Sequence, residues 1–491
     1  MKKIKEIFLD KTIYLFALIT ICFFGVFIKM QYAPDTYFVF SDSIKAVITQ
    51  FSSCGRFVTA IMAGVCLGVL KLSDKSIYFL SYAFALICTV ISLYRLFKLI
   101  NKDIENKILS CLMATLVIIN IFSFELYVYI EKGIMMFSVL MCILAVEQVD
   151  KYLENRNWKY FVWAIFYMII ATFSYQGTVG IFVAISLIYI IKYSKTIIEF
   201  LLNNVKVALI YGIPAIVNFI LVRFTNSNSR VEGNIILSES VQKIIEGTKN
   251  LLINTYDLFP KYLFSICILG IILFAIYKAI LSKEGKTKDK LLKISGLIYI
   301  LVGTLFATVA PQILQNTDSI WFVARSSYPM ASVIGILLIY IFNNFNIKNI
   351  ERNSIVVLSI SFMIIQLIFF MRFAIDGYTV NSIDKQQATQ IINKINIYEE
   401  QTGNKITKIA FYQDKSTAYV YPDIKASGDI NIRAFSKDWV SIAIINYYSG
   451  RQLENIKGSE HLVQNFKEHD WSEYNQEQII FENDTIHLCL Y

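Results

Sequence analysis

The sequence contains little charge, little proline and almost no histidine. Of its 491 residues, 17% are Asp, Glu, Lys or Arg, six are proline and three are histidine. Soluble domains carry charge on about a quarter of their residues, so this composition excludes an ordinary soluble enzyme. Hydrophobic residues make up 56% of the chain and the mean hydropathy is +0.54, which also excludes a disordered or a disulfide-rich secreted protein. We therefore predict a polytopic α-helical membrane protein.

Motifs of the common soluble enzymes are absent from the sequence. There is no Walker loop, no nucleophile elbow, no dinucleotide fingerprint and no Cys/His spacing of the kind that binds zinc. His461, His469 and His487 all lie near the C-terminus, so acid–base chemistry in the membrane part must come from Asp, Glu, Lys or Tyr. Among the cysteines only Cys54 and Cys489 look exposed. They could form a disulfide, but two unpaired thiols are the simpler interpretation.

Eleven apolar runs have the length that a bilayer crossing requires, about 20 residues. The first, 12–30, follows a segment with four lysines. It is too long for a signal peptide and no A-x-A cleavage site follows it, so we interpret it as an anchor with the N-terminus inside. The other ten runs are 75–97, 107–124, 133–149, 159–175, 178–194, 207–224, 260–280, 291–310, 328–345 and 354–372.

The distribution of basic residues predicts which side of the membrane each loop occupies. The segment 55–70 is apolar but short, which favours a re-entrant or interfacial helix over a crossing. With eleven crossings, the segments expected inside carry about twice as many Lys and Arg residues as those expected outside, in agreement with the positive-inside rule. The basic loop 282–293 is the strongest inside anchor. Because the number of crossings is odd, the C-terminus is expected outside.

The C-terminal segment differs from the rest in charge and in pattern. Residues 376–491 hold 11 Lys and Arg against 16 Asp and Glu, a net charge of −5, whereas residues 1–375 hold 35 against 21, a net charge of +14. A basic membrane part indicates contact with lipid headgroups, not with nucleic acid. We expect residues 1–375 to form the transmembrane domain and 376–491 a small extracytoplasmic α+β domain that begins with a helix over 383–402. Alternating polar and apolar residues predict its strands at 405–412, 429–435 and 484–491.

Charged and polar side chains gather in the loops expected outside. Any one of them could be a helix-end side chain that only reaches the lipid headgroups, but carboxylates and cations from several loops converge on one side. A carboxylate can deprotonate a sugar hydroxyl, and arginine suits a phosphate leaving group because its planar guanidinium donates two parallel hydrogen bonds. Nucleotide sugars are scarce outside the membrane, so the donor would be linked to a lipid. The candidate residues are Asp35, Asp42, Arg56, Glu125, Glu131, Lys132, Tyr175, Gln176 and Arg325.

Five stretches, in their order along the chain, resemble one known family. YAPDTY (32–37) and GRFVTAIM (55–62) come first, and FSYQGTVGIF (173–182), ARSSY (324–328) and KDWVSIAIINYYSG (437–450) follow. The pattern is similar to that of bacterial glucosyltransferases of the Gtr type. These are polytopic membrane enzymes of the GT-C class that glucosylate O-antigen and related surface glycans. The resemblance therefore implies a GT-C-like fold in the plasma (inner) membrane of a bacterium.

The resemblance also implies a donor, an acceptor and a catalytic base. The donor would be polyprenyl-phosphate glucose, the acceptor a surface glycan, and the reaction an inverting transfer at the outer face of the membrane. Asp35 matches the carboxylate that serves as base in the family. The family often has two adjacent acids at this place, whereas Thr36 follows Asp35 here, so Asp42 is a second candidate.

Residues of the other loops complete the site that the resemblance implies. Arg56 and Arg325 would hold the phosphate, and Gln176, together with Tyr175, would contact the sugar or the phosphate. The remaining candidates for substrate binding are Glu125, Glu131 and Lys132. Several of the candidates also have a purely structural interpretation. Asp35 or Arg56 could cap a helix, and Tyr175 and Gln176 could pack between helices.

Neither a metal nor another cofactor is expected. Two arginines can neutralise a lipid monophosphate without a divalent ion. Carboxylates near Asp35 could nevertheless bind a hard cation. The alternative functions are a polysaccharide polymerase or ligase, a flippase for a lipid-linked saccharide, and an adhesion or sensor protein. A flippase is disfavoured because the expected crossings hold almost no charge and no internal repeat occurs. A ligase is disfavoured because the loop 225–259 is only moderate in size, and a sensor would not need eleven helices.

Overall fold

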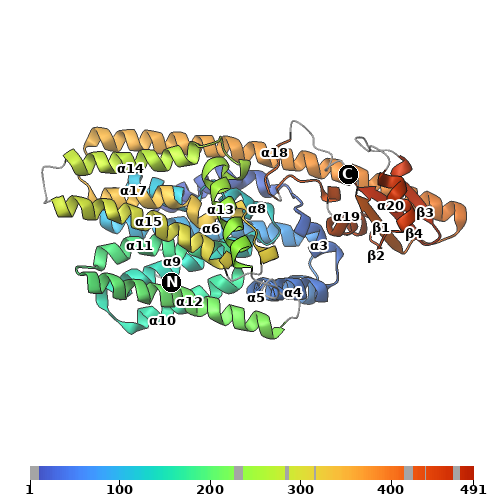
Figure 1. Ribbon diagram of the computed structural model, residues 1–491, viewed down its shortest axis with the longest axis horizontal. Helices are drawn as coiled ribbons and strands as arrows, with labels where there is room; N and C mark the ends of the chain where they lie inside the picture. Colours follow the sequence, from blue (N-terminus) through green and yellow to red (C-terminus); the bar gives the residue numbers. More distant parts are fainter. Residues whose placement is uncertain are drawn as a thin grey trace. The chain divides into compact units, whose positions relative to one another are not determined.

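The computed structural model describes residues 10–104, 106–225, 236–281, 287–313, 317–413, 424–428, 430–436, 438–467 and 476–490 (Figure 1). These residues divide into two compact units. The first comprises the described parts of Met1–Ile28, Ile48–Tyr127 and Glu131–Met371. The second comprises the described parts of Lys29–Val47, Val128–Ile130 and Arg372–Tyr491.

The first unit is a bundle of helices whose bounds follow the apolar runs of the sequence. In chain order its helices are α2 (Lys11–Phe24), α5 (Phe57–Ala63), α6 (Asp74–Ile104), α7 (Lys107–Ile118), α8 (Ser123–Val128), α9 (Lys132–Asn155), α10 (Trp158–Ser174), α11 (Gly180–Tyr193), α12 (Ile197–Thr225), α13 (Leu237–Asn254), α14 (Leu263–Leu281), α15 (Thr287–Ile313), α16 (Tyr328–Ala331), α17 (Val333–Asn344) and the first part of α18 (Asn349–Thr402). Helix α4 (Ile44–Ser53) joins the two units along the chain.

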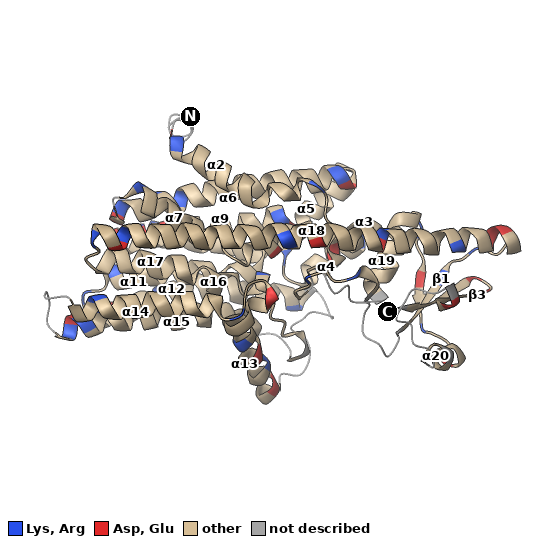
Figure 2. Ribbon diagram, turned by 90° about the horizontal axis from the view of Figure 1, so that it is seen from above, with Lys and Arg blue, Asp and Glu red and all other residues tan. Residues whose placement is uncertain are grey.

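Eight helices among the described residues are long and apolar enough to cross a membrane, as a polytopic helical membrane protein requires. Shorter apolar helices coincide with the three remaining expected crossings, at Lys107–Ile118, Trp158–Ser174 and Val333–Asn344. The segment expected to lie at the interface is the short helix Phe57–Val69, which is α5 continued by a π-helical turn, η2 (Gly64–Val69). Figure 2 shows that charged residues are absent from the middle of α14 and α15 and gather near their ends.

Helix α9 is the central helix of the bundle. It packs against α6, α10 and α11, and most of its length is buried. Because α9 begins at Lys132, Glu131 and Lys132 enter the interior of the bundle together with the first turn of the helix. Aromatic rings fill the neighbouring space: those of Phe24 and Tyr127 stack at a centroid distance of 3.7 Å, and the Tyr127 hydroxyl lies 2.6 Å from Thr89 Oγ1.

The second unit contains a four-stranded sheet in the order β2-β1-β4-β3. Strand β1 pairs in parallel with β2 and β4, and β3 pairs antiparallel with β4. The strands are β1 (Lys408–Gln413), β2 (Glu454–Ile456), β3 (Ile479–Glu482) and β4 (Thr485–Leu490). The helices of this unit are α3 (Pro34–Ser41), the second part of α18, α19 (Asp438–Ser449) and α20 (Glu460–Lys467).

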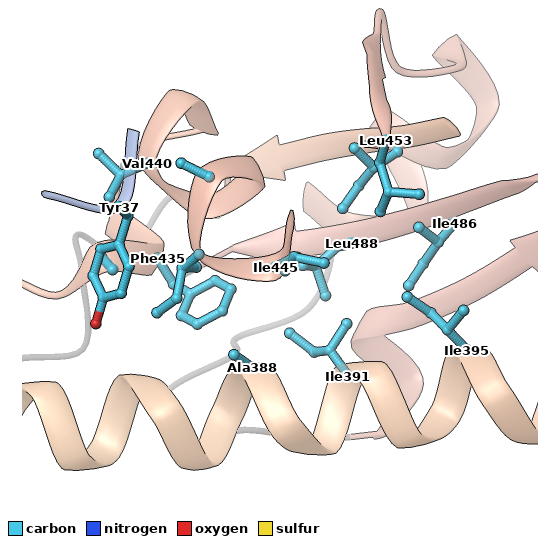
Figure 3. Close-up of a cluster of buried hydrophobic side chains, with 14 of the residues drawn as sticks. Tyr37, Ala388, Ile391, Ile395, Phe435, Val440, Ile445, Leu453, Ile486 and Leu488 are labelled. Carbon is cyan, nitrogen blue, oxygen red and sulfur yellow. The ribbon is translucent and has the colours of Figure 1, made fainter. Parts of the chain in front are cut away.

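The alternation of side chains along β1 and β4 places helices on both faces of the sheet. Ile409 and Leu488 face a core formed with α18 and α19, in which Ile391 of α18 takes part (Figure 3). Ala410 and Cys489 face the opposite way, toward α20. Both central strands are therefore covered on two sides, which explains why apolar residues occur on both of their faces.

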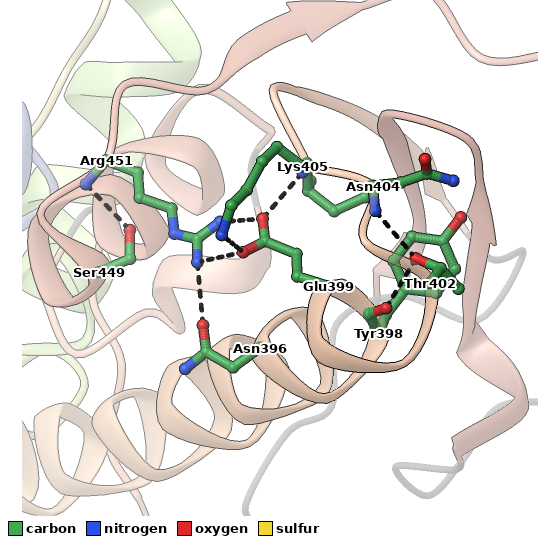
Figure 4. Close-up of polar contacts among 9 residues, drawn as sticks. Asn396, Tyr398, Glu399, Thr402, Asn404, Lys405, Ser449 and Arg451 are labelled. Atoms are coloured by element: carbon green, nitrogen blue, oxygen red, sulfur yellow. Dashed lines mark hydrogen bonds and ion pairs between the residues drawn. The ribbon is translucent and has the colours of Figure 1, made fainter.

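A buried carboxylate ties the end of α18 to the chain around it (Figure 4). Glu399 accepts hydrogen bonds from Arg451 Nη1 at 2.6 Å, from Lys405 Nζ at 3.0 Å and from the backbone N–H of Ile406 at 2.8 Å. Arg451 also donates to Asn396 Oδ1 at 2.9 Å. The charge of Glu399 is thus compensated, and the start of the sheet is attached to the helix that precedes it.

Two expectations for the C-terminal segment are wrong. The described part of 429–435 forms no strand of the sheet: Ile430 makes an isolated bridge with Ser427, and a 3₁₀ turn, η7 (Ala434–Ser436), follows. The segment is held against α18 by tertiary contacts, because Arg433 donates to Asp384 and Gln387. Cys489 is buried beneath α20 and not exposed.

Candidate functional site

The first unit contains a cavity of about 470 Å³ that brings four of the sequence-predicted site residues together. Arg56, Tyr175, Gln176 and Arg325 all line it, although they come from segments far apart in the sequence. Arg56 precedes α5, Tyr175 and Gln176 lie between α10 and α11, and Arg325 lies in a 3₁₀ turn, η6 (Ala324–Ser326), before α16. The bundle therefore places two guanidinium groups on the wall of one cavity.

Arg56 follows a turn that is stabilised by hydrogen bonds from the amide side chains of Gln176 and Asn218. Gly55 has φ = +71°, in the region that favours glycine, and a Cβ at this position would lie 2.3 Å from Asn218 Oδ1. Gln176 Nε2 donates to the carbonyls of Cys54 and Gly55, at 3.0 Å each, and Asn218 Nδ2 donates to the carbonyl of Gly55 at 2.7 Å. The amide nitrogen of Gln176 thus binds the protein backbone, which fixes the direction in which Arg56 leaves the turn.

The guanidinium of Arg56 lies between a carboxylate and an aromatic ring. Its Nη1 donates to Glu131 Oε1 at 3.1 Å, and its Cζ lies 4.8 Å from the centroid of the Tyr175 ring, a cation–π contact. The Arg56 side chain keeps 14% of its surface exposed, whereas that of Glu131 keeps 3%. Arg56 therefore reaches the cavity while its carboxylate partner stays behind it.

Arg325 is held still more firmly. Glu125 Oε2 accepts from the backbone N–H of Arg325, and Glu125 Oε1 accepts from Arg325 Nη1, both at 2.5 Å. The segment that carries Arg325 is fixed to the end of α15 by Gln312, whose Nε2 donates to the Trp321 carbonyl at 3.2 Å and whose Oε1 accepts from the Trp321 N–H at 3.3 Å. Both the backbone and the side chain of Arg325 are therefore positioned.

Lys132 does not line the cavity. Its side chain is completely buried, and its Nζ lies 3.6 Å from the centroid of the Tyr78 ring. Nζ makes no hydrogen bond within the described part of the chain. Lys132 interacts electrostatically with Glu131, its neighbour in sequence and the carboxylate that pairs with Arg56. Any effect of Lys132 on a ligand in the cavity is therefore indirect.

Most of the remaining cavity wall is apolar, with Asn218 and Gln312 among its polar residues. Ala215, Phe219 and Val222 contribute from α12, and Phe306 and Ile313 from α15. Phe306 and Ile313 are also exposed on the surface of the bundle. The cavity thus combines two arginines with a mostly apolar wall that includes side chains exposed on the surface of the bundle, which suits a molecule with an anionic group and a hydrocarbon chain.

Asp35 and Asp42 belong to the second unit and not to the unit that contains the cavity. Asp35 lies in the first turn of α3 and is half-buried. The N-cap of this helix is Ala33, whose N–H donates to Thr36 Oγ1 at 3.2 Å, so Asp35 does not occupy the capping position. Asp42 is exposed at the C-terminal end of α3 and accepts from the N–H of Ser43 at 2.6 Å.

Glu125, Glu131 and Lys132, which were expected in a loop on the outer side, have buried side chains. They are buried because the bundle supplies each with a partner: an arginine for each carboxylate and an aromatic ring for the lysine. Sequence reasoning also missed Asn218 and Gln312, which hold the segments of Arg56 and Arg325. For Asn218 a signal was present, since a lone amide inside the apolar run 207–224 indicates a specific role.

No family model matches the chain, and no curated protein shows significant sequence similarity to it. The likeness to Gtr-type glucosyltransferases therefore rests on the motifs alone. Among the residues that the structure describes, no group of three or more His, Cys, Asp or Glu side chains is arranged to hold a metal ion. The candidate site is consequently defined by its two arginine–glutamate pairs and the cavity that they border.

Proposed function

We propose that the chain is an integral-membrane glycosyltransferase. It moves a sugar, in our proposal glucose, from a polyprenyl-phosphate donor to a surface polysaccharide on the outer face of a bacterial plasma membrane. In this proposal the phosphate of the donor binds at Arg56 and Arg325, and the polyprenyl chain lies along the apolar wall formed by α12 and α15. Tyr175 and Gln176 line the same cavity as the two arginines.

One observation carries the proposal: two arginines from distant segments line a single cavity whose remaining wall is mostly apolar and includes side chains exposed on the surface of the bundle. A buried guanidinium in a membrane protein requires an anionic partner. Glu125 and Glu131 fulfil this requirement in the protein itself and hold the arginines in place. Because the guanidinium also binds phosphate through paired hydrogen bonds, a lipid-linked phosphate suits this cavity better than an uncharged lipid.

In the proposed reaction Asp35 is the general base. It accepts the proton of the acceptor hydroxyl while the hydroxyl oxygen attacks the anomeric carbon of the donor sugar. The bond from that carbon to the phosphate oxygen breaks, polyprenyl phosphate leaves, and the configuration at the anomeric carbon inverts. The negative charge gained by the departing phosphate is stabilised by Arg56 and Arg325. Asp42 is the second candidate for the base.

The proposed topology has eleven crossings, formed by the eight long helices together with α7, α10 and α17. The N-terminus is inside and the C-terminus outside. A cysteine substituted for Lys288, at the start of α15, should resist a membrane-impermeant thiol reagent in intact cells. A cysteine substituted for Lys249 of α13 should react, after subtraction of the labelling of the native cysteines. Reaction at position 288 would invert the topology and contradict the proposal.

The phosphate role of the arginines is tested by the dependence of transfer on donor concentration. Arg56→Gln and Arg325→Gln should each raise the donor KM by about tenfold or more, because each removes a charge-assisted contact worth roughly 1.5–3 kcal/mol. Arg352→Gln is the matched control, since Arg352 lies in the first turn of α18 and does not line the cavity. If the donor KM is unchanged in both cavity variants, the donor phosphate does not bind at these two arginines.

A further inference from the structure

Helix α13 differs from every long helix of the bundle in its direction and in its pattern. Both views of the molecule show α13 running across the direction of α14 and α15 (Figures 1 and 2). It follows α12 and precedes α14, two helices apolar enough to cross the membrane, and it packs against α14 and α15. Because α14 and α15 are both long and apolar enough to cross a bilayer, a helix that runs across them would lie along the membrane plane.

One side of α13 packs on the protein. Ser240 Oγ lies 3.0 Å from Thr317 Oγ1, and Lys243 Nζ donates to the Thr317 carbonyl at 2.9 Å. One turn further along, Gly247 lies so close to Phe322 that a Cβ would come within 2.4 Å of its ring. These contacts hold α13 against the segment 317–327, which carries Arg325.

A second side of α13 is apolar and uncovered. Leu237, Val241 and Ile245 are spaced four residues apart, so they form one stripe along the helix. Their side chains are 74%, 46% and 60% exposed. At 3.6 residues per turn this stripe lies roughly 110° around the helix from the side that packs on 317–327.

The third side of α13 is polar. Gln242 and Glu246 are exposed and joined by a hydrogen bond of 2.9 Å, and Glu239 and Lys249 are exposed on the same side. The helix holds two glutamates and two lysines, so its formal charge is zero. Its attraction to a membrane surface would therefore come from the apolar stripe and not from anionic headgroups.

From these three sides we infer that α13 is an in-plane membrane helix whose stripe of Leu237, Val241 and Ile245 is embedded in the bilayer interface. The occupant of this surface is lipid, because α13 stands between α12 and α14, two helices apolar enough to cross the membrane, and packs against α14, where Ile266 and Leu269 are exposed. The polar side then faces the aqueous phase. Because α13 packs on the segment 317–327, its attachment to the bilayer also stabilises the position of that segment. This inference does not depend on the proposed enzymatic function.

Quenching by brominated lipids tests the inference in the full-length chain reconstituted in lipid nanodiscs. Val241→Trp and Ile245→Trp add a tryptophan to the stripe, and Glu246→Trp adds one to the polar side as the matched control. After subtraction of the wild-type emission, phospholipids brominated along their acyl chains should quench the two stripe positions at least about twofold more than position 246. Replacing anionic by zwitterionic brominated lipid should leave this ratio unchanged.

Three outcomes would overturn the inference. Equal quenching at stripe and control positions would mean that α13 does not lie with its stripe toward lipid. Stripe positions shielded from brominated lipid would indicate that a second copy or another protein covers the surface. A ratio that disappears without anionic lipid would mean that charge, not the stripe, brings α13 to the membrane. Two stripe variants are used so that a folding defect in one of them leaves the other to decide.

Discussion

The Glu125 carboxylate binds Arg325 twice, through the backbone N–H and through the guanidinium Nη1, each at 2.5 Å. The two residues are 200 positions apart in the sequence. One buried carboxylate therefore fixes both the chain direction and the side-chain direction of an arginine that lines the cavity. Most of what positions this candidate site consists of such pairings between distant residues.

Glu125→Gln should destabilise the bundle and weaken the proposed donor binding. The substitution leaves the Arg325 charge buried without its counter-charge, and breaking a buried pair in this way typically costs about 3–5 kcal/mol. The double substitution Glu125→Gln with Arg325→Gln should recover much of the thermal stability, because no uncompensated charge remains, but it should not recover donor binding. Thermal unfolding and donor KM, measured on the same preparations, separate the two effects. A double variant as unstable as Glu125→Gln would disprove the charge explanation.

Gly55→Ala should displace the Arg56 side chain although residue 56 itself is unchanged. An alanine would have to adopt φ = +71° and its Cβ would collide with Asn218 Oδ1 at 2.3 Å, and the left-handed conformation alone costs about 1–2 kcal/mol. We expect a lower unfolding temperature and a raised donor KM. Gly270→Ala on α14 is the control, because nothing lies within 4 Å of the position where its Cβ would be built. Equal activity of the two variants would show that the turn at Gly55 does not position Arg56.

Asp35→Asn should lower the rate of transfer by about 10²–10⁴-fold while the protein still folds and reaches the membrane, because a general base contributes about that much. Asparagine preserves the shape of the side chain but cannot accept the proton. Asp42→Asn should have a smaller effect, since Asp42 is exposed and bound to the N–H of Ser43. A near-normal rate in Asp35→Asn would transfer the role of base to Asp42.

His487 should make the second unit less stable in mild acid. Its burial lowers the pKa of the imidazole below the usual value of 6.5, so the folded state holds the proton less readily than the unfolded state does. The second unit is therefore most stable at a pH above 6.5, and its stability falls as the pH decreases below that value. Hydrogen exchange of β4, corrected for the intrinsic effect of pH, should reveal this loss between about pH 7.5 and about pH 5.5.

The controls for this pH effect are provided by two histidine variants. His487→Gln should abolish most of the pH dependence, because glutamine does not titrate. His461→Gln should leave most of it in place, since burial is the main cause of the lowered pKa of His487 and the His461 side chain is 66% exposed. A pH dependence that survives His487→Gln would assign it to another group.

The helices of the membrane part were predictable because hydrophobicity is a local property of the sequence. Each of the eleven expected crossings coincides with an apolar helix or helix pair. The ends were less predictable: α7 stops at Ile118, whereas the apolar run continues to 124. The reason is Asn120, whose Oδ1 accepts from the N–H of Phe122 at 3.0 Å and whose Nδ2 donates to Ser332 Oγ at 2.9 Å. These side-chain bonds compete with continuation of the helix.

The partners of the charged residues were not predictable from local pattern. Arg56, Tyr175, Gln176 and Arg325 could be chosen as candidates because polar residues at the ends of apolar runs are conspicuous. Nothing in the sequence near Glu131, however, indicates that its carboxylate binds Arg56. In the second unit the same limit applies to 429–435, where alternation predicts a strand but the pairing of Arg433 with Asp384 holds the described part of the segment in another conformation.

The most direct test of the proposed function is the fate of the donor sugar. The purified chain, reconstituted in liposomes, is incubated with polyprenyl phosphate that carries radiolabelled glucose and with surface polysaccharide from cells that lack this protein. We predict that the label moves from the lipid to the polysaccharide, and that Arg56→Gln and Arg325→Gln slow the transfer. Label that stays on the lipid, or that crosses the bilayer still attached to it, would contradict a glycosyltransferase and favour a flippase.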